Sequence, residues 1–361
     1  MAGMWHTLDA VIKYLGSKRL LVPRIVSLVD AVPDVRVVVD LFSGTSRVGH
    51  ALKRSGRFVR ANDHNAYAHA LARCYVQADA ERVGATVDRL LPTLSAAPPV
   101  AGWFSETYAE AARYLQPDNA ARVAGMRQWL ADHEAALEPD VFAVLLVALV
   151  EAADRVDSTT GVQMAWLKKW SRRSFNPVAL RRPDILPGGG EAHQLDALEA
   201  ASRLDGDLVY LDPPYNQHSY LSNYHVWETL VRWDAPDTYG KARKRVDCRT
   251  RKSPFNSKRR IHAAFADVVA AARAPWLLVS FSDEGFLARD ELEAMLSTRG
   301  PVLVLERDHP RYIGARIGIY NPSGERVGRV THTRNTERLY LVAPDAPSLR
   351  AVSERLAASA G

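Results

Sequence analysis

The sequence is poor in cysteine and has no long apolar run. Its two cysteines, Cys74 and Cys248, fit neither a metal-ligand spacing nor a disulfide framework. The longest apolar run covers residues 141–150, about half of the roughly 20 residues that a membrane-spanning helix needs. The first residues show no signal-peptide pattern. We therefore expect a cytoplasmic protein with no structural metal and no membrane contact.

Acidic residues are almost missing from one segment, residues 241–260. This segment holds ten lysines and arginines and one aspartate, a local charge of +9, whereas the whole chain carries +6 and the remainder therefore −3. Positive charge concentrated in one place indicates a polyanionic partner. The alternative is a solvated charge run that binds nothing.

The bulk composition is that of an ordinary globular protein. With 361 residues, 47% of them apolar and 24% charged, the chain can form one large domain or one domain with a substantial insertion.

Strand-like runs alternate with helical patterns, a rhythm that predicts an α/β fold with a mostly parallel, Rossmann-like sheet. The predicted strands cover residues 35–40, 58–62, 207–211, 276–281, 302–306 and 338–342. The predicted helices cover residues 17–30, 47–55, 65–77, 141–153, 223–232 and 262–272. A turn signal at residues 321–324 predicts a hairpin within residues 316–330.

A long stretch separates the second predicted strand from the third. Residues 80–137 are rich in alanine and interrupted by prolines, residues 155–187 are basic and irregular, and glycines follow at 188–190. We expect residues 80–187 to form an inserted, mostly helical recognition lobe, and residues 1–79 and 188–361 to form the domain that carries the chemistry.

The strand predicted at residues 207–211 runs directly into Asp212, Pro213, Pro214 and Tyr215. A carboxylate and a rigid carbonyl at a strand end can each accept one N–H of an amine on an aromatic ring, which frees the nitrogen lone pair. The prolines fix φ and remove backbone donors, and the tyrosine offers a flat face for an extruded base. The alternative is a proline turn that merely ends the strand.

Small residues follow the first predicted strand, at Phe42, Ser43 and Gly44, before a predicted helix. Such a turn lets the backbone approach a ligand and aims helix N–H groups at it. Ser46 stands where the dinucleotide fingerprint needs glycine, so a tight structural turn remains an alternative.

Acidic residues follow two other predicted strands. Asp63 comes 23 residues after Asp40, a spacing typical of a ribose-binding carboxylate; Asn62 competes for that role. Asp196 precedes residues 207–211 and is a candidate for the cofactor or for a helix N-cap. Near the N-terminus, Tyr14 and Lys18 flank a small-residue turn that could clamp a carboxylate or merely cap a helix.

Taken in order, these motifs resemble the Dam-like DNA adenine-N6 methyltransferases of the α arrangement. The likeness extends over residues 13–18, 40–45 and 212–215 and continues through residues 223–233, 251–260 and 336–340. Two departures are Tyr14, where many relatives have tryptophan, and Ser46, where many have glycine.

The resemblance implies roles for individual residues. S-adenosylmethionine would be bound by Tyr14, Lys18, Phe42, Ser43, Gly44, Asp63, Asp196 and Asp212, and the catalytic group would be Asp212, Pro213, Pro214 and Tyr215. The stretch from Arg155 to Gln163 matches the family's DNA-reading loop. Cationic candidates for DNA binding are Arg155, Arg172, Arg173, Lys241, Arg251 and Arg260.

The implied function is site-specific methyl transfer from S-adenosylmethionine to N6 of an adenine flipped out of double-stranded DNA. A cognate restriction endonuclease is a further candidate partner. Two alternatives stay open: adenine in RNA as the substrate, and a catalytically silent nucleic-acid-binding protein on the same scaffold.

Overall fold

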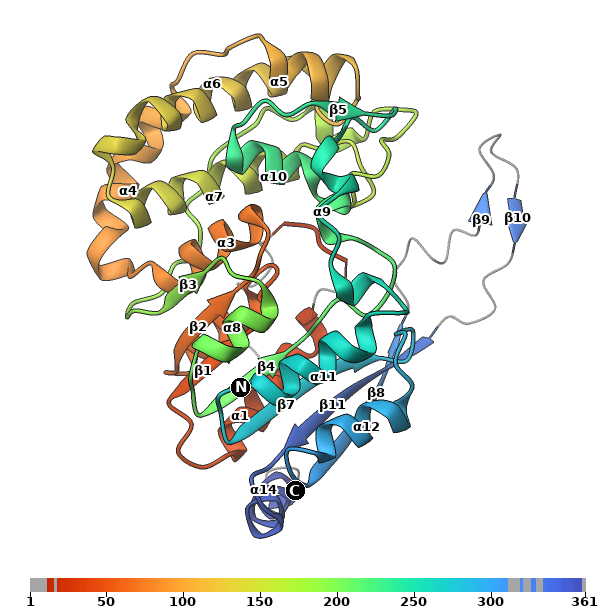
Figure 1. Ribbon diagram of the computed structural model, residues 1–361. Helices are drawn as coiled ribbons and strands as arrows, with labels where there is room; N and C mark the ends of the chain where they lie inside the picture. Colours follow the sequence, from red (N-terminus) through yellow and green to blue (C-terminus); the bar gives the residue numbers. More distant parts are fainter. Residues whose placement is uncertain (1–11, 16–17, 311–318, 321–325, 329–333, 359–361) are drawn as a thin grey trace.

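The computed structural model describes residues 12–15, 18–310, 319–320, 326–328 and 334–358. Its main feature is a sheet of seven strands in the order β3-β2-β1-β4-β7-β11-β8 (Figure 1). In that order the strands are Glu191–His193, Phe58–Asn62, Val37–Asp40, Leu208–Leu211, Trp276–Ser282, Arg334–Val342 and Val302–Pro310. Within this sheet β11 runs antiparallel to both of its neighbours, and every other pairing is parallel. The predicted mostly parallel, Rossmann-like α/β sheet is confirmed.

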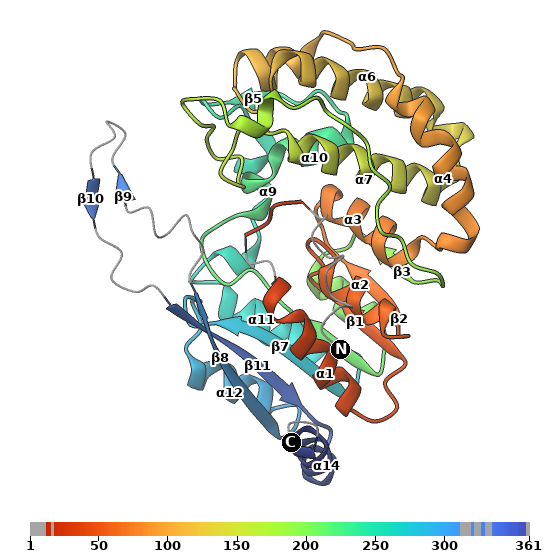
Figure 2. The same cartoon turned by 180° about the vertical axis from the view of Figure 1, so that it is seen from behind.

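Helices cover both faces of the sheet, as Figures 1 and 2 show from opposite sides. Helices α1 (Val22–Ala31), α2 (Arg47–Arg54) and α14 (Ala346–Ala358) share one hydrophobic cluster with the sheet. Helices α8 (Ala197–Arg203), α11 (Ile261–Ala271) and α12 (Arg289–Ser297) share the other. All four residues of β4 are buried, which explains why this strand reads as a continuous apolar run.

A helical lobe lies beside the sheet and has its own core. It contains α4 (Ala80–Ser95), α6 (Pro117–His133) and α7 (Pro139–Arg155). The same core includes residues of α3 (Ala66–Ala72), the π-helix η3 (Arg73–Gln77) and α10 (His225–Arg232). The insertion at residues 80–187 therefore packs against segments from both sides of it in the sequence; its boundaries as a separate unit stay a prediction.

Short elements complete the described chain. The helical ones are η2 (Lys18–Leu20), α5 (Trp103–Ser105), η4 (Glu106–Glu110), η5 (Glu134–Ala136), η6 (Arg172–Phe175), α9 (Tyr220–Asn223), η7 (Val246–Arg249) and η8 (Pro254–Asn256). Strands β5 (Thr238–Tyr239) and β6 (Lys244–Arg245) pair antiparallel, as do β9 (Ile319–Tyr320) and β10 (Arg326–Gly328). The second pair belongs to the predicted hairpin, whose turn at residues 321–324 lies outside the described residues.

The six predicted strands are all present, with ends that differ by a few residues. The helix predicted at 17–30 is divided into η2 and α1, because Pro23 fits only the first turn of a new helix. The helix predicted at 65–77 ends as a π-helix from Arg73 onward. Strand β3 was not predicted; it is short and half-buried, and it forms by pairing with the edge of β2.

No helix among the described residues combines the length and the apolar character needed to cross a membrane. Within the same residues, no cluster of three or more histidine, cysteine or acidic side chains has the arrangement of a metal site.

Candidate active site

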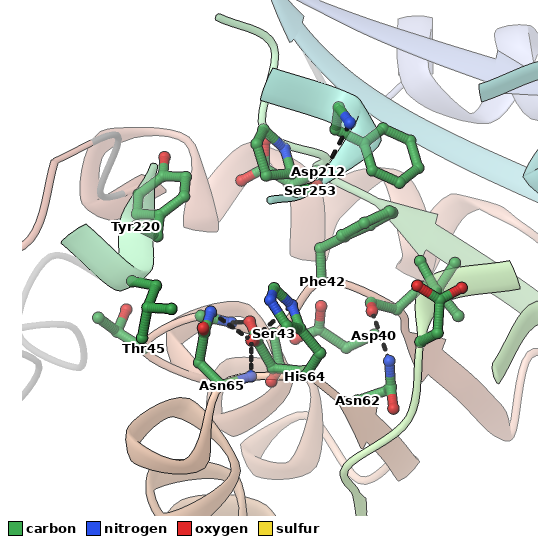
Figure 3. A pocket seen from close by; sticks show the side chains of 18 of the residues that line it. Asp40, Phe42, Ser43, Thr45, Asn62, His64, Asn65, Asp212, Tyr220 and Ser253 are labelled. Carbon is green, nitrogen blue, oxygen red and sulfur yellow. Dashed lines mark hydrogen bonds and ion pairs between the residues drawn. The ribbon is translucent and has the colours of Figure 1, made fainter. Parts of the chain in front are cut away.

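The parallel strands end at one edge of the sheet, and a pocket of about 290 Å³ opens there. The strand order reverses beside β1, because β2 and β3 lie on one side of it and β4 on the other. Ligands of open α/β sheets bind at such a point. The structure brings all eight predicted cofactor-binding residues to the lining of this pocket: Tyr14, Lys18, Phe42, Ser43, Gly44, Asp63, Asp196 and Asp212. In Figure 3, Asp212 lies across the pocket from His64 and Asn65.

The turn after β1 is built by residues in the left-handed conformation. Gly44 has φ +51° and Ser46 has φ +58°. The Ser43 N–H donates to the Asn62 carbonyl at 2.9 Å, and the Gly44 N–H donates to Asp63 Oδ2 at 3.1 Å. A Cβ on Gly44 would lie 3.2 Å from the Tyr14 hydroxyl, so glycine is favoured here both by the positive φ and by the close approach of Tyr14.

Asp63 and Asn62 have different tasks at the end of β2. Asp63 accepts from the Gly44 N–H and, through Oδ1, from the backbone and side-chain N–H groups of Asn65. Asn62 is 1% exposed, and its amide is bonded to the backbone of Leu41 and Leu195. Asn62 therefore ties strand ends together, while Asp63 organises the turn beside the pocket.

Asp196 is an N-cap, one of the two roles considered from its sequence position, and it also lies at the pocket. Its carboxylate caps helix α8 by accepting from the Leu198 N–H at 2.9 Å, and the residue lines the pocket as well. The N-cap is shown, and the cofactor contact stays a prediction.

Three tyrosines form a stack at the pocket wall. The Tyr14 ring is stacked against the rings of both Tyr220 and Tyr224, with centroid distances of 5.0 and 4.7 Å, and the centroids of those two rings are 6.4 Å apart. Burial, with smaller effects from neighbouring tyrosines and Asp63, raises the pKa of Tyr14 well above its usual value. Tyr220 also lines the pocket; no motif spacing pointed to it, because the stack depends on how α9 folds back against residues 12–15.

Asp212 is ion-paired with Lys18. The ammonium of Lys18 lies 3.1 Å from Asp212 Oδ1 and 3.5 Å from Glu337 Oε2. Burial raises the pKa of Asp212 to about 6, since the opposing effect of Lys18 is only partial and Glu337 adds to the rise. Burial opposes the charge of Lys18, yet Asp212 and Glu337 together keep its pKa above the usual value. The sequence pointed to Lys18 as a cofactor residue; the structure also joins it to Asp212.

Asp40 adds a second carboxyl group to the site. It is 1% exposed at the end of β1, and its Oδ2 accepts from the Gly49 N–H at 3.1 Å. Burial and the charge of Asp212 raise its pKa to about 7, against the lowering effect of that hydrogen bond.

The residues after Asp212 lie on two sides of the turn. Pro214 lines the pocket. The ring centroid of Tyr215 lies 5.5 Å from that of Phe281 and 5.8 Å from Lys18 Nζ. The Tyr215 carbonyl accepts a hydrogen bond from the Phe286 N–H at 2.8 Å. The aromatic ring of Tyr215 is thus held in place beside the Lys18–Asp212 pair.

The predicted DNA-binding cations divide into two groups. Arg172, Lys241 and Arg260 are exposed. Arg155, Arg173 and Arg251 have partners within the protein. Arg155 donates to the Ala179 carbonyl, Arg173 binds Asp157 and the Thr159 carbonyl, and Arg251 pairs with Glu228 at 3.0 Å.

Several pocket residues were not singled out from the sequence. They are Thr45, Arg47, His64, Asn65, Leu195, Tyr220, Ser253 and Phe255, among others. Ser253 and Phe255 belong to the stretch at 251–260 that carries the family resemblance, and that likeness was the available signal. Phe255 packs edge-on against Phe42 at 5.1 Å.

Comparison with known proteins adds independent information. The sequence model of a family described as D12 class N6 adenine-specific DNA methyltransferase matches residues 14–266. Similar curated proteins include Type II methyltransferase M.FokI of Planomicrobium okeanokoites, which is 28% identical over 80% of this chain and 47% of its own length. Type II methyltransferase M.NlaIII of Neisseria lactamica is 27% identical over 77% of this chain and 84% of its own length.

A third similar protein, Modification methylase StsI of Streptococcus sanguinis, is 28% identical over 79% of this chain and 46% of its own length. The chain thus spans about half the length of M.FokI and of StsI.

Proposed function

The chain belongs to the family of D12 class N6 adenine-specific DNA methyltransferases, and on this premise we propose that it transfers a methyl group from S-adenosylmethionine to N6 of an adenine flipped out of double-stranded DNA. The observation that carries the proposal is the position of Asp212, which follows β4 and lines a pocket with the turn of β1 and Asp63. An acceptor for the amine thereby stands in the same pocket as the candidate cofactor-binding residues.

The pocket fits the chemistry of S-adenosylmethionine. Two buried polar atoms, Ser43 Oγ and Asn65 Oδ1, have no hydrogen-bond partner in the described protein, and both residues line the pocket. Buried polar groups require a partner, so a polar ligand would satisfy them. The carboxylates of Asp63 and Asp196 are suited to ribose hydroxyls, and Phe42 and Phe255 supply apolar ring surface.

When bound, S-adenosylmethionine supplies a methyl group already activated by a positive sulfonium. The protein then has to position the amine and to stabilise the positive charge that develops on its nitrogen. Asp212 and the Pro213 carbonyl would accept the two N–H groups. Because the site is buried, the negative charge of Asp212 acts more strongly there than it would in water.

Double-stranded DNA would be bound by exposed cations that lie outside the pocket lining. Arg172, Lys241 and Arg260 are free to reach phosphates, and phosphate contacts position a duplex without reading its sequence. Arg155, Arg173 and Arg251 would act on DNA indirectly, since they already hold protein segments together. We further propose that the protein is cytoplasmic and that a cognate restriction endonuclease is its partner.

The experiment is to incubate the purified protein with labelled S-adenosylmethionine and unmethylated genomic DNA, and to identify the modified nucleoside by mass spectrometry. N6-methyladenine at one recurring sequence is the expected product. Unmethylated RNA serves as a parallel substrate. Methylation of RNA alone, or binding of DNA with no product, would instead support one of the two alternatives.

A further inference from the structure

Glu337 reaches the active site from β11, which runs antiparallel to both β7 and β8. It stands near the start of β11, opposite Ser282 at the end of β7. Because β11 is antiparallel, its first half lies at the edge where the parallel strands end. Glu337 thereby comes next to Asp212, although 124 residues separate the two in the sequence.

One cation serves two carboxylates at this point. Lys18 is 6% exposed, and its ammonium lies 3.1 Å from Asp212 Oδ1 and 3.5 Å from Glu337 Oε2. The side chains of Asp212 and Glu337 are 19% and 14% exposed. A buried ammonium needs a paired anion at all times. Lys18 can therefore release Asp212 only if Glu337 remains.

The proposed reaction requires such a release. An N6–C bond forms, an S–C bond breaks with its electron pair left on sulfur, and one N6 proton leaves to water. The carboxylate of Asp212 must accept an N–H of the amine during this step, yet in the structure its Oδ1 faces the ammonium of Lys18 at 3.1 Å. An oxygen that is fully engaged by a cation is a poorer acceptor for the reacting amine.

We propose that Glu337 is a positioning residue that holds Lys18 in place while Asp212 turns its carboxylate to the adenine amine. This inference rests on the proposed methyl transfer and deepens it. Glu337 itself touches neither the base nor the methyl donor. Without its charge, Lys18 would bind Asp212 alone and restrain it.

The test is Glu337→Gln in the full chain, assayed for methyl transfer to DNA and, by calorimetry, for binding of S-adenosylmethionine. We expect kcat to fall about 10- to 100-fold, by analogy with the loss that follows removal of a partner that orients a metal ligand. KM for DNA and Kd for the cofactor should change less than about threefold, because Glu337 contacts neither ligand and its loss removes no binding interaction.

The pH profile separates positioning from a merely structural role. Asp212 faces Lys18 from η2, Glu337 from β11 and Asp40 from β1, with Tyr210 and Tyr220 nearby. The charge of Glu337 contributes to the raised pKa of Asp212. In Glu337→Gln, the acidic limb of kcat should therefore move to lower pH.

Two further variants make the test decisive. Glu306→Gln removes a carboxylate from the neighbouring strand β8, where it is exposed and paired with Arg338, and should leave kcat and its pH profile unchanged. Glu337→Asp keeps the charge and should recover part of kcat, and it replaces the glutamine variant if that one does not fold. Unchanged kcat in Glu337→Gln overturns the proposal, whether or not the cofactor affinity changes. Inactivity of the wild-type protein on DNA would instead refute the proposed function.

Discussion

Ser46 is a single residue whose backbone conformation conflicts with its type. It has φ +58°, is fully buried, and its hydroxyl has no partner within the described protein. The left-handed conformation costs a residue with a side chain roughly 1–2 kcal/mol. The sequence had flagged Ser46 as the departure from the glycine fingerprint, and the structure shows that the turn keeps the conformation suited to glycine.

Ser46→Gly should therefore stabilise the protein by about 0.5–1 kcal/mol, after the larger chain entropy of unfolded glycine is counted. Urea unfolding followed by circular dichroism measures this. Ser46→Ala is the matched control, since it removes the hydroxyl and keeps the Cβ at positive φ. A glycine variant no more stable than the alanine variant would contradict the strain argument.

Asp212 sets the expected pH dependence of the reaction. Its pKa is raised to about 6 by burial, against the lowering effect of Lys18, and only its ionised form accepts an N–H of the amine. As pH falls through about 6, the ionised fraction falls, so kcat should decline with it and approach tenfold per pH unit below that value. Single-turnover rates between pH 5 and 8 measure this limb. A rate that stays constant down to about pH 5 would show that Asp212 is not the acceptor, since the carboxyl would then be largely protonated.

The β5–β6 hairpin is the element that exposes the first cations of the basic segment. Its turn places Lys241 and Arg243 in exposed positions, and the Ala242 carbonyl is tied to the Tyr114 hydroxyl of the lobe at 2.9 Å. Arg245, in the same segment, is buried and paired with both oxygens of Asp234. The charge run at 241–260 is thus neither wholly a partner surface nor wholly a solvated face.

Lys241→Ala should weaken DNA binding and reduce the slope of log K against log salt by about 0.9, the value for one lost phosphate contact. Fluorescence anisotropy with a labelled duplex at several salt concentrations measures the slope. Arg350→Ala, which removes one exposed cation on α14, is the control and should leave the slope unchanged. Equal slopes for the two variants would show that Lys241 in the hairpin makes no phosphate contact.

Elements with a strong local pattern were predictable, and those formed by distant pairing were not. The apolar run of β4 and the alternation around β2 gave these strands directly. Three half-buried residues became β3 because β2 offers them an edge. The tyrosine stack and the contact of Glu337 with Lys18 were missed because their partners lie far away in the sequence. The resemblance over residues 336–340 pointed to the segment that holds Glu337, but not to this contact.

The molecule as a whole joins its helical lobe to the sheet through buried charged groups. Glu228 of α10 is fully buried; it accepts from the Tyr67 N–H at 3.0 Å and from Arg251 at 3.0 Å. Lys13, next to Tyr14, is bonded to Asp157 at 2.8 Å. Segments that line the pocket are therefore anchored to the lobe proposed to recognise DNA.

The most direct measurement is methyl transfer by Asp212→Ala under single-turnover conditions, with cofactor and DNA binding measured on the same preparation. The account predicts that N6-methyladenine formation falls by about 100-fold or more, while DNA affinity and unfolding temperature stay close to those of the wild type. Wild-type rates in Asp212→Ala would contradict the assignment of this pocket as the site of methyl transfer.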